Sequence, residues 1–117
     1  MAGRYVPGRG DIVWLQFNPQ AGHEQAGHRP ALVVSPREYN RLVGLALFCP
    51  VTSQVKGYPF EVLLPSGRKV SGAVLADQLK SLDWRARKAK YISTVPRETM
   101  SEVLAKVRTL IEDDDFR

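Results

Sequence analysis

The chain has 117 residues, of which 44% are hydrophobic and 25% charged, as is typical of one globular domain with its own core. A single cysteine excludes an internal disulfide and no stretch is apolar enough to span a bilayer, so we expect a cytoplasmic protein that does not enter a membrane. The net charge is +5, and residues 1–111 carry 16 Lys and Arg against 8 Asp and Glu, which indicates a polyanionic partner, nucleic acid first and acidic peptide second.

Short segments rich in β-branched and aromatic residues, separated by turn residues, fill the first three quarters of the chain. The first runs over residues 11–17 and ends at Asn18-Pro19. The others are 31–35, 45–49 (ending at Pro50), 60–64, 70–75 and a weaker one at 91–94, with a short helix expected between Pro36 and Val43. Five to seven such strands predict a compact barrel or a tightly curved sheet.

The C-terminal part changes to a helical period. Apolar residues recur there at steps of three and four: Met100, Val103, Leu104, Val107, Leu110 and Ile111. Pro96 suits the first helical turn, where its missing N–H costs nothing. The acidic run after Ile111 lies at the unfavourable end of the helix dipole. We therefore predict one domain over residues 1–111 and an acidic tail over residues 112–117.

One connection, between Pro19 and Pro30, is longer than a usual hairpin loop and holds both histidines, His23 and His28, together with Glu24 and Arg29. Long loops in small domains tend to be functional, although a tolerated insertion is the alternative. A Glu–Arg pair in a loop is also more often a surface ion pair than a catalytic device.

The residue inventory argues against several chemistries. Two histidines and one cysteine leave no set of ligands at zinc spacing. There is no Gly-x-Ser-x-Gly elbow, and the glycines at 8 and 10 match neither a P-loop nor a dinucleotide fingerprint. We therefore predict that the protein works without a metal or another cofactor.

RNA cleavage requires fewer catalytic groups from the protein than these chemistries do, because every ribose carries its own nucleophile, the 2′-hydroxyl, beside the phosphate that it attacks. The protein has to supply a base, charge or donors for the phosphorane, and a proton for the departing 5′-oxygen. Glu24 is a candidate base, Arg29 a clamp on the non-bridging oxygens, and Thr52 a hydroxyl donor. These three are the candidate catalytic residues.

The chain resembles the MazF/PemK toxin family, including its Kid-like group, from about Arg4 to Ile111. The stretches that carry the likeness are RYVP (4–7), GDIVW (10–14), EQAGHRPA (24–31), VTSQ (51–54), KGYPFEV (56–62), ADQLKS (76–81) and WRAR (84–87). The resemblance implies a mainly β fold with some helix, the SH3-like small barrel of the CcdB/PemK-type toxins, with a C-terminal helix and a homodimeric assembly.

The same resemblance implies a toxin of a type II toxin–antitoxin pair that cuts single-stranded RNA at short motifs, often containing ACA, without metal. The products would carry a 2′,3′-cyclic phosphate and a 5′-hydroxyl. Arg29 and Thr52 match the family's active-site positions, and Glu24 matches a glutamate important in part of the family. Arginine is a poor general acid because it stays protonated, so His28 or water would return the proton. An acidic, MazE-like antitoxin is the implied protein partner.

We expect the RNA to be held by stacking and by contacts to phosphates and base edges. The predicted RNA-binding residues are Trp14 and Phe17 for stacking, Lys56, Lys80 and Arg87 for phosphates, Asp77 and Gln78 for base edges, and Gln25 and His28 from the long loop. A core position for Trp14 and a capped turn at Asp77 and Gln78 are the alternatives. The basic run from Arg85 to Lys90 also fits a merely solvated face.

Two other functions remain open at this point. One is a nucleic-acid-binding module on a small barrel that has no catalytic activity. The other is a gyrase-inhibiting toxin of the same fold, a class that depends on a C-terminal Trp-Gly-Ile, whereas this chain ends in Asp-Asp-Asp-Phe-Arg.

Overall fold

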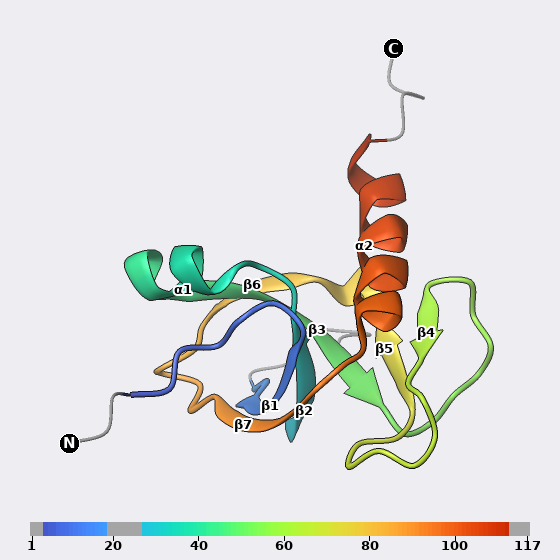
Figure 1. Cartoon of the computed structure of the whole chain (residues 1–117), viewed down its shortest axis with the longest axis horizontal. Helices are drawn as coiled ribbons and strands as arrows, with labels where there is room; N and C mark the ends of the chain where they lie inside the picture. Colours follow the sequence, from blue (N-terminus) through green and yellow to red (C-terminus); the bar gives the residue numbers. More distant parts are fainter. Residues whose placement is uncertain (1–3, 19–26, 113–117) are drawn as a thin grey trace.

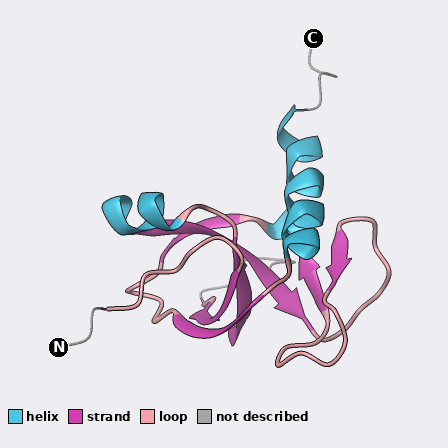
Figure 2. Cartoon of the chain, in the orientation of Figure 1, coloured by secondary structure: helices cyan, strands magenta, loops and turns pink. Residues whose placement is uncertain are grey.

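The structure, a computed structural model, describes residues 4–18 and 27–112 and is dominated by a strongly curved antiparallel sheet (Figure 1). The strands are β1 (Asp11–Gln16), β2 (His28–Val33), β3 (Leu45–Thr52), β4 (Glu61–Leu63), β5 (Ala73–Leu75), β6 (Lys80–Asp83) and β7 (Lys90–Thr94). They lie in the order β4-β5-β3-β2-β1-β7, and β6 pairs with β3. The helices are α1 (Arg37–Val43), the 3-10 turn η1 (Ala76–Gln78) and α2 (Arg97–Glu112). Figure 2 shows how strands outweigh helices, which confirms the mainly β class with a C-terminal helix.

Alternation along the strands divides the apolar residues between two cores. On β1, Ile12 contributes to one core, whereas Val13 and Leu15 contribute to the other. The first core is closed by the buried residues of α2, which include Met100, Val103 and Val107. The second contains Phe17, Ala31, Val33, Phe48 and Trp84. Because both faces of β1, β2 and β3 are packed, these three strands form the rigid centre of the molecule.

Strand β3 continues through Pro50, where the sequence had predicted its end. On one side, β3 pairs with β6 through residues 45–48 and with β5 through Val51 and Thr52. Pro50 lies in the gap between these two segments, so its missing N–H removes no hydrogen bond from either ladder. The strand therefore carries Thr52 two residues beyond the predicted boundary.

Other boundaries also differ from the sequence prediction. Strand β2 starts at His28 rather than at residue 31, because β1 supplies partners as far as the pair Gln16–His28. Strand β5 is confined to Ala73–Leu75, and β6 was not predicted at all. The residues of β6 alternate between half-buried and exposed, and pairing with the first half of β3 makes this polar segment a strand.

The predicted helices are confirmed with small shifts. Helix α1 follows Pro36 and ends at Gly44, whose φ of 82° is a left-handed conformation that favours glycine. Helix α2 follows Pro96 and buries the predicted apolar residues of its first three turns, but Leu110 and Ile111 are exposed where it projects from the sheet (Figure 1). In the part of the chain that the structure describes, no helix is long and apolar enough to cross a membrane.

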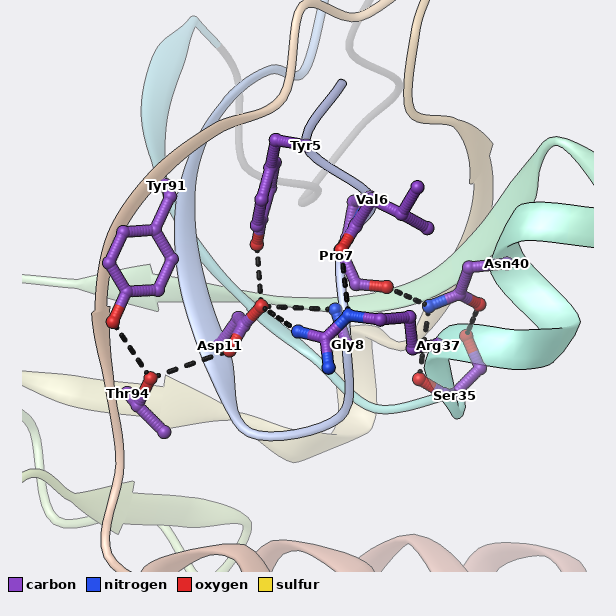
Figure 3. Close-up of polar contacts among 10 residues, drawn as sticks. All are labelled: Tyr5, Val6, Pro7, Gly8, Asp11, Ser35, Arg37, Asn40, Tyr91 and Thr94. Atoms are coloured by element: carbon purple, nitrogen blue, oxygen red, sulfur yellow. Dashed lines mark hydrogen bonds and ion pairs between the residues drawn. The ribbon is translucent and has the colours of Figure 1, made fainter. Parts of the chain in front are cut away.

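A buried carboxylate fastens the N-terminal segment to the sheet and to α1 (Figure 3). Asp11 Oδ2 accepts hydrogen bonds from the Tyr5 hydroxyl at 2.6 Å, from the Gly8 N–H at 3.0 Å and from the Arg37 guanidinium at 3.0 Å. Thr94 donates to the other oxygen at 3.4 Å. Burial and the neighbouring Asp11 carboxylate raise the pKa of Tyr5 above its usual range, so this phenol keeps its proton.

Candidate active site

Strands β2 and β3 carry the predicted residues Arg29 and Thr52 at neighbouring ends. The paired residues are Ala31–Pro50, Leu32–Cys49 and Val33–Phe48, and the ladder ends there. We infer from the same register, continued by two residues, that Arg29 is aligned with Thr52. Alternation also assigns Arg29 to the face of Ala31 and Val33, and Thr52 to the face of Phe48. A guanidinium and a hydroxyl thus share one face at adjoining strand ends.

Thr52 is held rigidly at this position. It is 7% exposed, and its Oγ1 accepts a hydrogen bond from the Gln54 N–H at 3.1 Å. Its backbone is crossed closely by Gly72, where an added Cβ would overlap the Thr52 carbonyl oxygen. Gly72 also has a φ of +115°, so both space and backbone conformation require glycine there.

Beside Thr52 lies a cavity of about 540 Å³. It is lined by Thr52, Gln54, Lys56, Tyr58, Pro59, Phe60, Glu61, Leu75, Asp77 and Gln78. Three predicted RNA-binding residues, Lys56, Asp77 and Gln78, therefore meet the predicted catalytic Thr52 in one hollow. Lys56 comes from the loop over residues 53–60, whereas Asp77 and Gln78 come from η1, so only the fold brings them together.

The loop over residues 53–60 forms one wall of this cavity, and hydrogen bonds with Glu61 and Lys106 hold its backbone in place. The Glu61 carboxylate accepts hydrogen bonds from the N–H of Lys56 at 3.1 Å and of Gly57 at 2.8 Å. From α2, the Lys106 ammonium donates to the Pro59 carbonyl at 2.6 Å. A carboxylate and an ammonium that both bond to backbone groups hold the loop without using its own side chains.

The side chains of the cavity provide complementary chemistry for a nucleotide. The Lys56 ammonium lies 5.9 Å from the centroid of the Tyr58 ring, so a cation and an aromatic face are presented together. Asp77 is exposed and accepts hydrogen bonds, and the amide of Gln78 both donates and accepts. Such a set can read base edges and hold a phosphate.

The predicted stacking residues Trp14 and Phe17 differ in their exposure to solvent. Trp14 is 38% exposed and stacks on His28, with ring centroids 5.2 Å apart and an interplanar angle of 23°. Phe17 is 1% exposed and belongs to the second core. The prediction that Phe17 stacks on RNA is therefore corrected: an odd residue spacing on an alternating strand sends the two rings to opposite faces, and only the Trp14 ring reaches solvent.

The two other predicted phosphate contacts do not line the cavity. Arg87 donates from Nη1 to the carbonyls of Gln16 at 3.1 Å and Asn18 at 2.7 Å, and so braces the end of β1 where the long loop departs. Lys80 lies half-buried at the start of β6, opposite Phe48. Arg87 thus has a structural role at the end of β1, in addition to any contact with RNA.

Glu24 and Gln25, predicted as base and RNA contact, lie outside the described residues. Among the residues that the structure does describe, no three His, Cys, Asp or Glu side chains group as ligands of a metal would. Independence of metal stays a prediction that a cleavage assay in EDTA tests.

Cys49 lies behind the site, on β3. It is fully buried, and burial together with the charge of Asp77 raises the pKa of its thiol to about 12. A thiol with such a pKa is protonated at neutral pH and is a poor nucleophile, so Cys49 serves as a small buried core residue.

Sequence reasoning missed several parts of the cavity, namely Gln54, Tyr58, Glu61 and Leu75. Gly57 and Pro59 in the loop over residues 53–60 signal a shaped turn, and a lysine and a tyrosine within such a turn are the available indication of a binding loop. The role of Lys106 could not be inferred, because it acts on the backbone of a segment 47 residues away. Glu61 bonds to N–H groups only four and five residues before it, but no pattern of residue types signals that contact.

Comparison with known proteins shows to which family the chain belongs. A model of the PemK-like, MazF-like toxins of type II toxin–antitoxin systems matches residues 8–111. The chain belongs to this family. It is 52% identical over 111 residues to the endoribonuclease toxin MazF of Escherichia coli K12, covering 95% of this chain and 99% of the relative. It is 38% identical to the endoribonuclease PemK of Escherichia coli over 88% of this chain and 80% of that protein.

The solved structures of the family confirm the fold. The crystal structure of MazF from Deinococcus radiodurans is 55% identical and superposes with a TM-score of 0.90, covering 93% of this chain and 99% of that one. A MazE–MazF structure from the same organism superposes with a TM-score of 0.85 at 55% identity, covering 93% and 98% of the two chains. The small barrel that the resemblance implied is thus the fold of this MazF-like chain.

Proposed function

We propose that this toxin is a metal-independent endoribonuclease that cuts single-stranded RNA at short, ACA-like motifs, with Arg29 and Thr52 at the scissile phosphate. The single observation that carries the proposal is the β2–β3 register, which, continued beyond Ala31–Pro50, aligns Arg29 with Thr52, a residue that lines a cavity suited to a nucleotide. The relatives named above are endoribonucleases by name.

The chemistry follows from the groups at this place. A base removes the proton of the ribose 2′-hydroxyl, which attacks the adjacent phosphorus while the bond to the 5′-oxygen breaks. Arg29 and Thr52 donate to the non-bridging oxygens, where negative charge increases in the phosphorane. A proton from His28 or water reaches the departing 5′-oxygen. The products are a 2′,3′-cyclic phosphate and a 5′-hydroxyl, with no water consumed.

Glu24 is our candidate for the base, and its variant gives a separate test. Glu24→Gln removes the basic group and keeps the size of the side chain, so cleavage should slow strongly at neutral pH. If Glu24 is the base, the fall of the cleavage rate at acidic pH should disappear as well, because that fall reports protonation of the Glu24 carboxylate.

The decisive assay uses a labelled single-stranded RNA in excess EDTA. Cleavage that survives EDTA, leaves ends that accept a phosphate from a kinase at the 5′ side, and stops when the nucleotide at the cut is 2′-deoxy supports the proposal. Intact RNA under saturating protein would favour a binding module without activity. Inhibition of gyrase supercoiling by the purified protein would favour the gyrase-inhibiting class.

We also propose that the toxin works as a homodimer and is held in check by an acidic, MazE-like antitoxin, and that it acts in the cytoplasm, where its RNA lies. The excess of positive charge on residues 1–111 suits an acidic partner. MazE–MazF complexes have been solved for the Deinococcus relative. Dimer mass in solution and loss of cleavage on adding the acidic protein test these two assignments.

A further inference from the structure

The basic run at residues 85–90 is not used by the active site described above. Three of its members lie with Arg4 around two adjoining hollows of about 540 and 450 Å³. Tyr5 and Ala89 line both hollows, and no residue of either lines the cavity beside Thr52. We call this place the Tyr5 surface; it comprises Arg4, Tyr5, Arg85, Lys88, Lys90 and Tyr91.

The Tyr5 surface is strongly positive. The four cationic side chains are exposed, and within residues 4–18 and 27–112 none of them has an ion-pair partner. The nearest carboxylate along the chain, Asp83, accepts the backbone N–H groups of Arg85 and Ala86 at 3.0 and 2.9 Å and lines neither hollow. Four cations that have no ion-pair partner among the described residues repel one another, so an anion bound there is attracted by all four.

The surface also offers aromatic rings in fixed positions. Tyr91 is 48% exposed and meets Tyr5 edge to face, with centroids 5.7 Å apart. Both hydroxyls are engaged, that of Tyr5 with Asp11 and that of Tyr91 with Thr94, as Figure 3 shows. The rings are therefore oriented by the buried carboxylate cluster, and the exposed part of Tyr91 is available to a flat apolar group.

The turn that carries Lys88 has an unusual backbone. Lys88 has a φ of 58°, the left-handed region in which glycine or asparagine is favoured. Its N–H bonds to the Arg85 carbonyl at 3.0 Å, and the next N–H, of Ala89, bonds to the Trp84 carbonyl at 2.9 Å. A lysine that occupies this position at a conformational cost suggests that its charge has a use.

Cationic and aromatic side chains continue from the Tyr5 surface onto β1 and β2. Lys90 is the cross-strand partner of Trp14, and Trp14 stacks on His28 at the start of β2. Exposed cationic and aromatic side chains thus follow one another from β7 across β1 to β2. This is the composition of surfaces that track a single strand of nucleic acid, in which bases stack on rings while cations follow the phosphates.

We propose that the Tyr5 surface binds the single-stranded RNA that flanks the cleaved motif, with a base on Tyr91 and phosphates on the surrounding cations. The proposal rests on the proposed function, because it assigns a place to the part of the substrate outside the motif. RNA suits the surface better than an acidic peptide does, since the peptide would use the cations but has no base for the ring.

The test measures binding of two RNAs that share the mapped motif and carry a 2′-deoxy nucleotide at the cut, one short and one extended on both sides. The variants are Tyr91→Ser, Tyr91→Phe and the pair Lys88→Asn with Lys90→Gln; asparagine suits the backbone of residue 88. Lys69→Gln with Arg108→Gln removes the same charge elsewhere and is the matched control. Fluorescence anisotropy gives Kd at several salt concentrations.

We expect Tyr91→Ser to weaken binding of the long RNA by about tenfold, as loss of one stacked base does, and Tyr91→Phe to bind like the wild type. The lysine pair should lower the slope of log Kd against log salt by roughly 1.4, at about 0.7 for each lost phosphate contact. Binding of the short RNA and the rate of cleavage at saturation should not change, and melting curves confirm the fold.

Several results would overturn the proposal. Equal affinity of the wild type for both RNAs, equal weakening of both by the variants, or the same loss in the control pair would each do so. If the variants lose an acidic antitoxin peptide but keep the long RNA, the surface is a protein interface instead. Failure of the wild type to cut the all-ribose RNA contradicts only the proposed function, since binding is read on RNA that cannot be cut.

Discussion

The Asp11 cluster and the cavity beside Thr52 are both polar, yet they are built in opposite ways. Around Asp11, each polar atom of the carboxylate has a partner from the protein, supplied by Tyr5, Gly8, Arg37 and Thr94 (Figure 3). Beside Thr52, the exposed side chains of Gln54, Lys56 and Asp77 point into an open hollow.

This difference separates what holds the molecule together from what can bind. A buried carboxylate that is fully bonded contributes to stability but has no capacity left for a ligand. An exposed carboxylate or ammonium contributes little to stability and keeps its bonding capacity for a substrate. Substitutions in the two regions should therefore separate stability from activity.

The largest loss of cleavage activity should come from substitutions at the neighbouring ends of β2 and β3. Arg29→Ala and Thr52→Ala each remove a donor to the phosphorane, so each should lower the cleavage rate by about 10²–10³-fold. Single-turnover cleavage measures this, and circular dichroism should show a fold close to that of the wild type. Arg108→Ala, which removes an exposed arginine from α2, is the control and should cut normally. Wild-type rates in either active-site variant would place the site elsewhere.

At Asp11 we expect the opposite result, a loss of stability with cleavage activity retained. Asp11→Ala leaves the Gly8 N–H and the Tyr5 hydroxyl without their acceptor, which costs about 2–6 kcal/mol because unsatisfied buried groups cost about 1–3 kcal/mol each. The melting temperature should fall by roughly 10–20 °C. Cleavage at low temperature, where the variant is folded, should stay near the wild-type rate. A large loss of activity without loss of stability would contradict the separation of the two regions.

Gly72 offers a substitution that should affect both properties. In Gly72→Ala the added Cβ overlaps the Thr52 carbonyl and the residue keeps a positive φ, so we expect a loss of about 2 kcal/mol and about tenfold in cleavage rate. Gly67→Ala is the matched control, since Gly67 has a φ of +77° but open space around its Cα. The control should lose about 1 kcal/mol and no activity. Equal activity in both variants would show that the position of Thr52 is not critical.

A smaller change is expected from the support of the binding loop. Glu61→Gln replaces charge-assisted bonds to the Lys56 and Gly57 N–H groups with a weaker neutral acceptor. The loop should then hold Lys56 less firmly, and KM should rise by about threefold, equivalent to roughly 0.7 kcal/mol, with kcat unchanged. Glu102→Gln on the exposed face of α2 controls for the lost charge. A fall in kcat alone would argue against a positioning role in binding.

The effect expected at Cys49 is absent at neutral pH and appears only in alkali. Because burial raises the pKa of this thiol from 9.0 to about 12, the folded protein keeps a proton that the unfolded chain releases above pH 9. The free energy of unfolding should therefore fall as pH rises from about 9 towards 12. Denaturation midpoints of the wild type should drop more over this window than those of Cys49→Ala. A thiol reagent should reach Cys49 only in the unfolded chain.

Much of the fold could be predicted from local sequence. The period of α2, the short helix after Pro36 and the apolar character of β1 are set by residues close together in the chain, and the structure confirms them. The candidate residues Arg29, Thr52 and Lys56 were also found by residue type and by likeness to a family. The acidic tail over residues 112–117 and the catalytic role of Glu24 stay predictions.

The sequence by itself determined the elements and the inventory of chemical groups, because periodicity and turn chemistry are local properties. Tertiary structure alone decided which of those groups meet. Pairing of β3 with β2 and β5 extended the strand past Pro50 to Thr52, and packing buried Phe17 while leaving Trp14 in solvent. The supports from Lys106 and Gly72 were equally hidden, since each acts on the backbone of a distant segment and leaves no pattern in the residues around it.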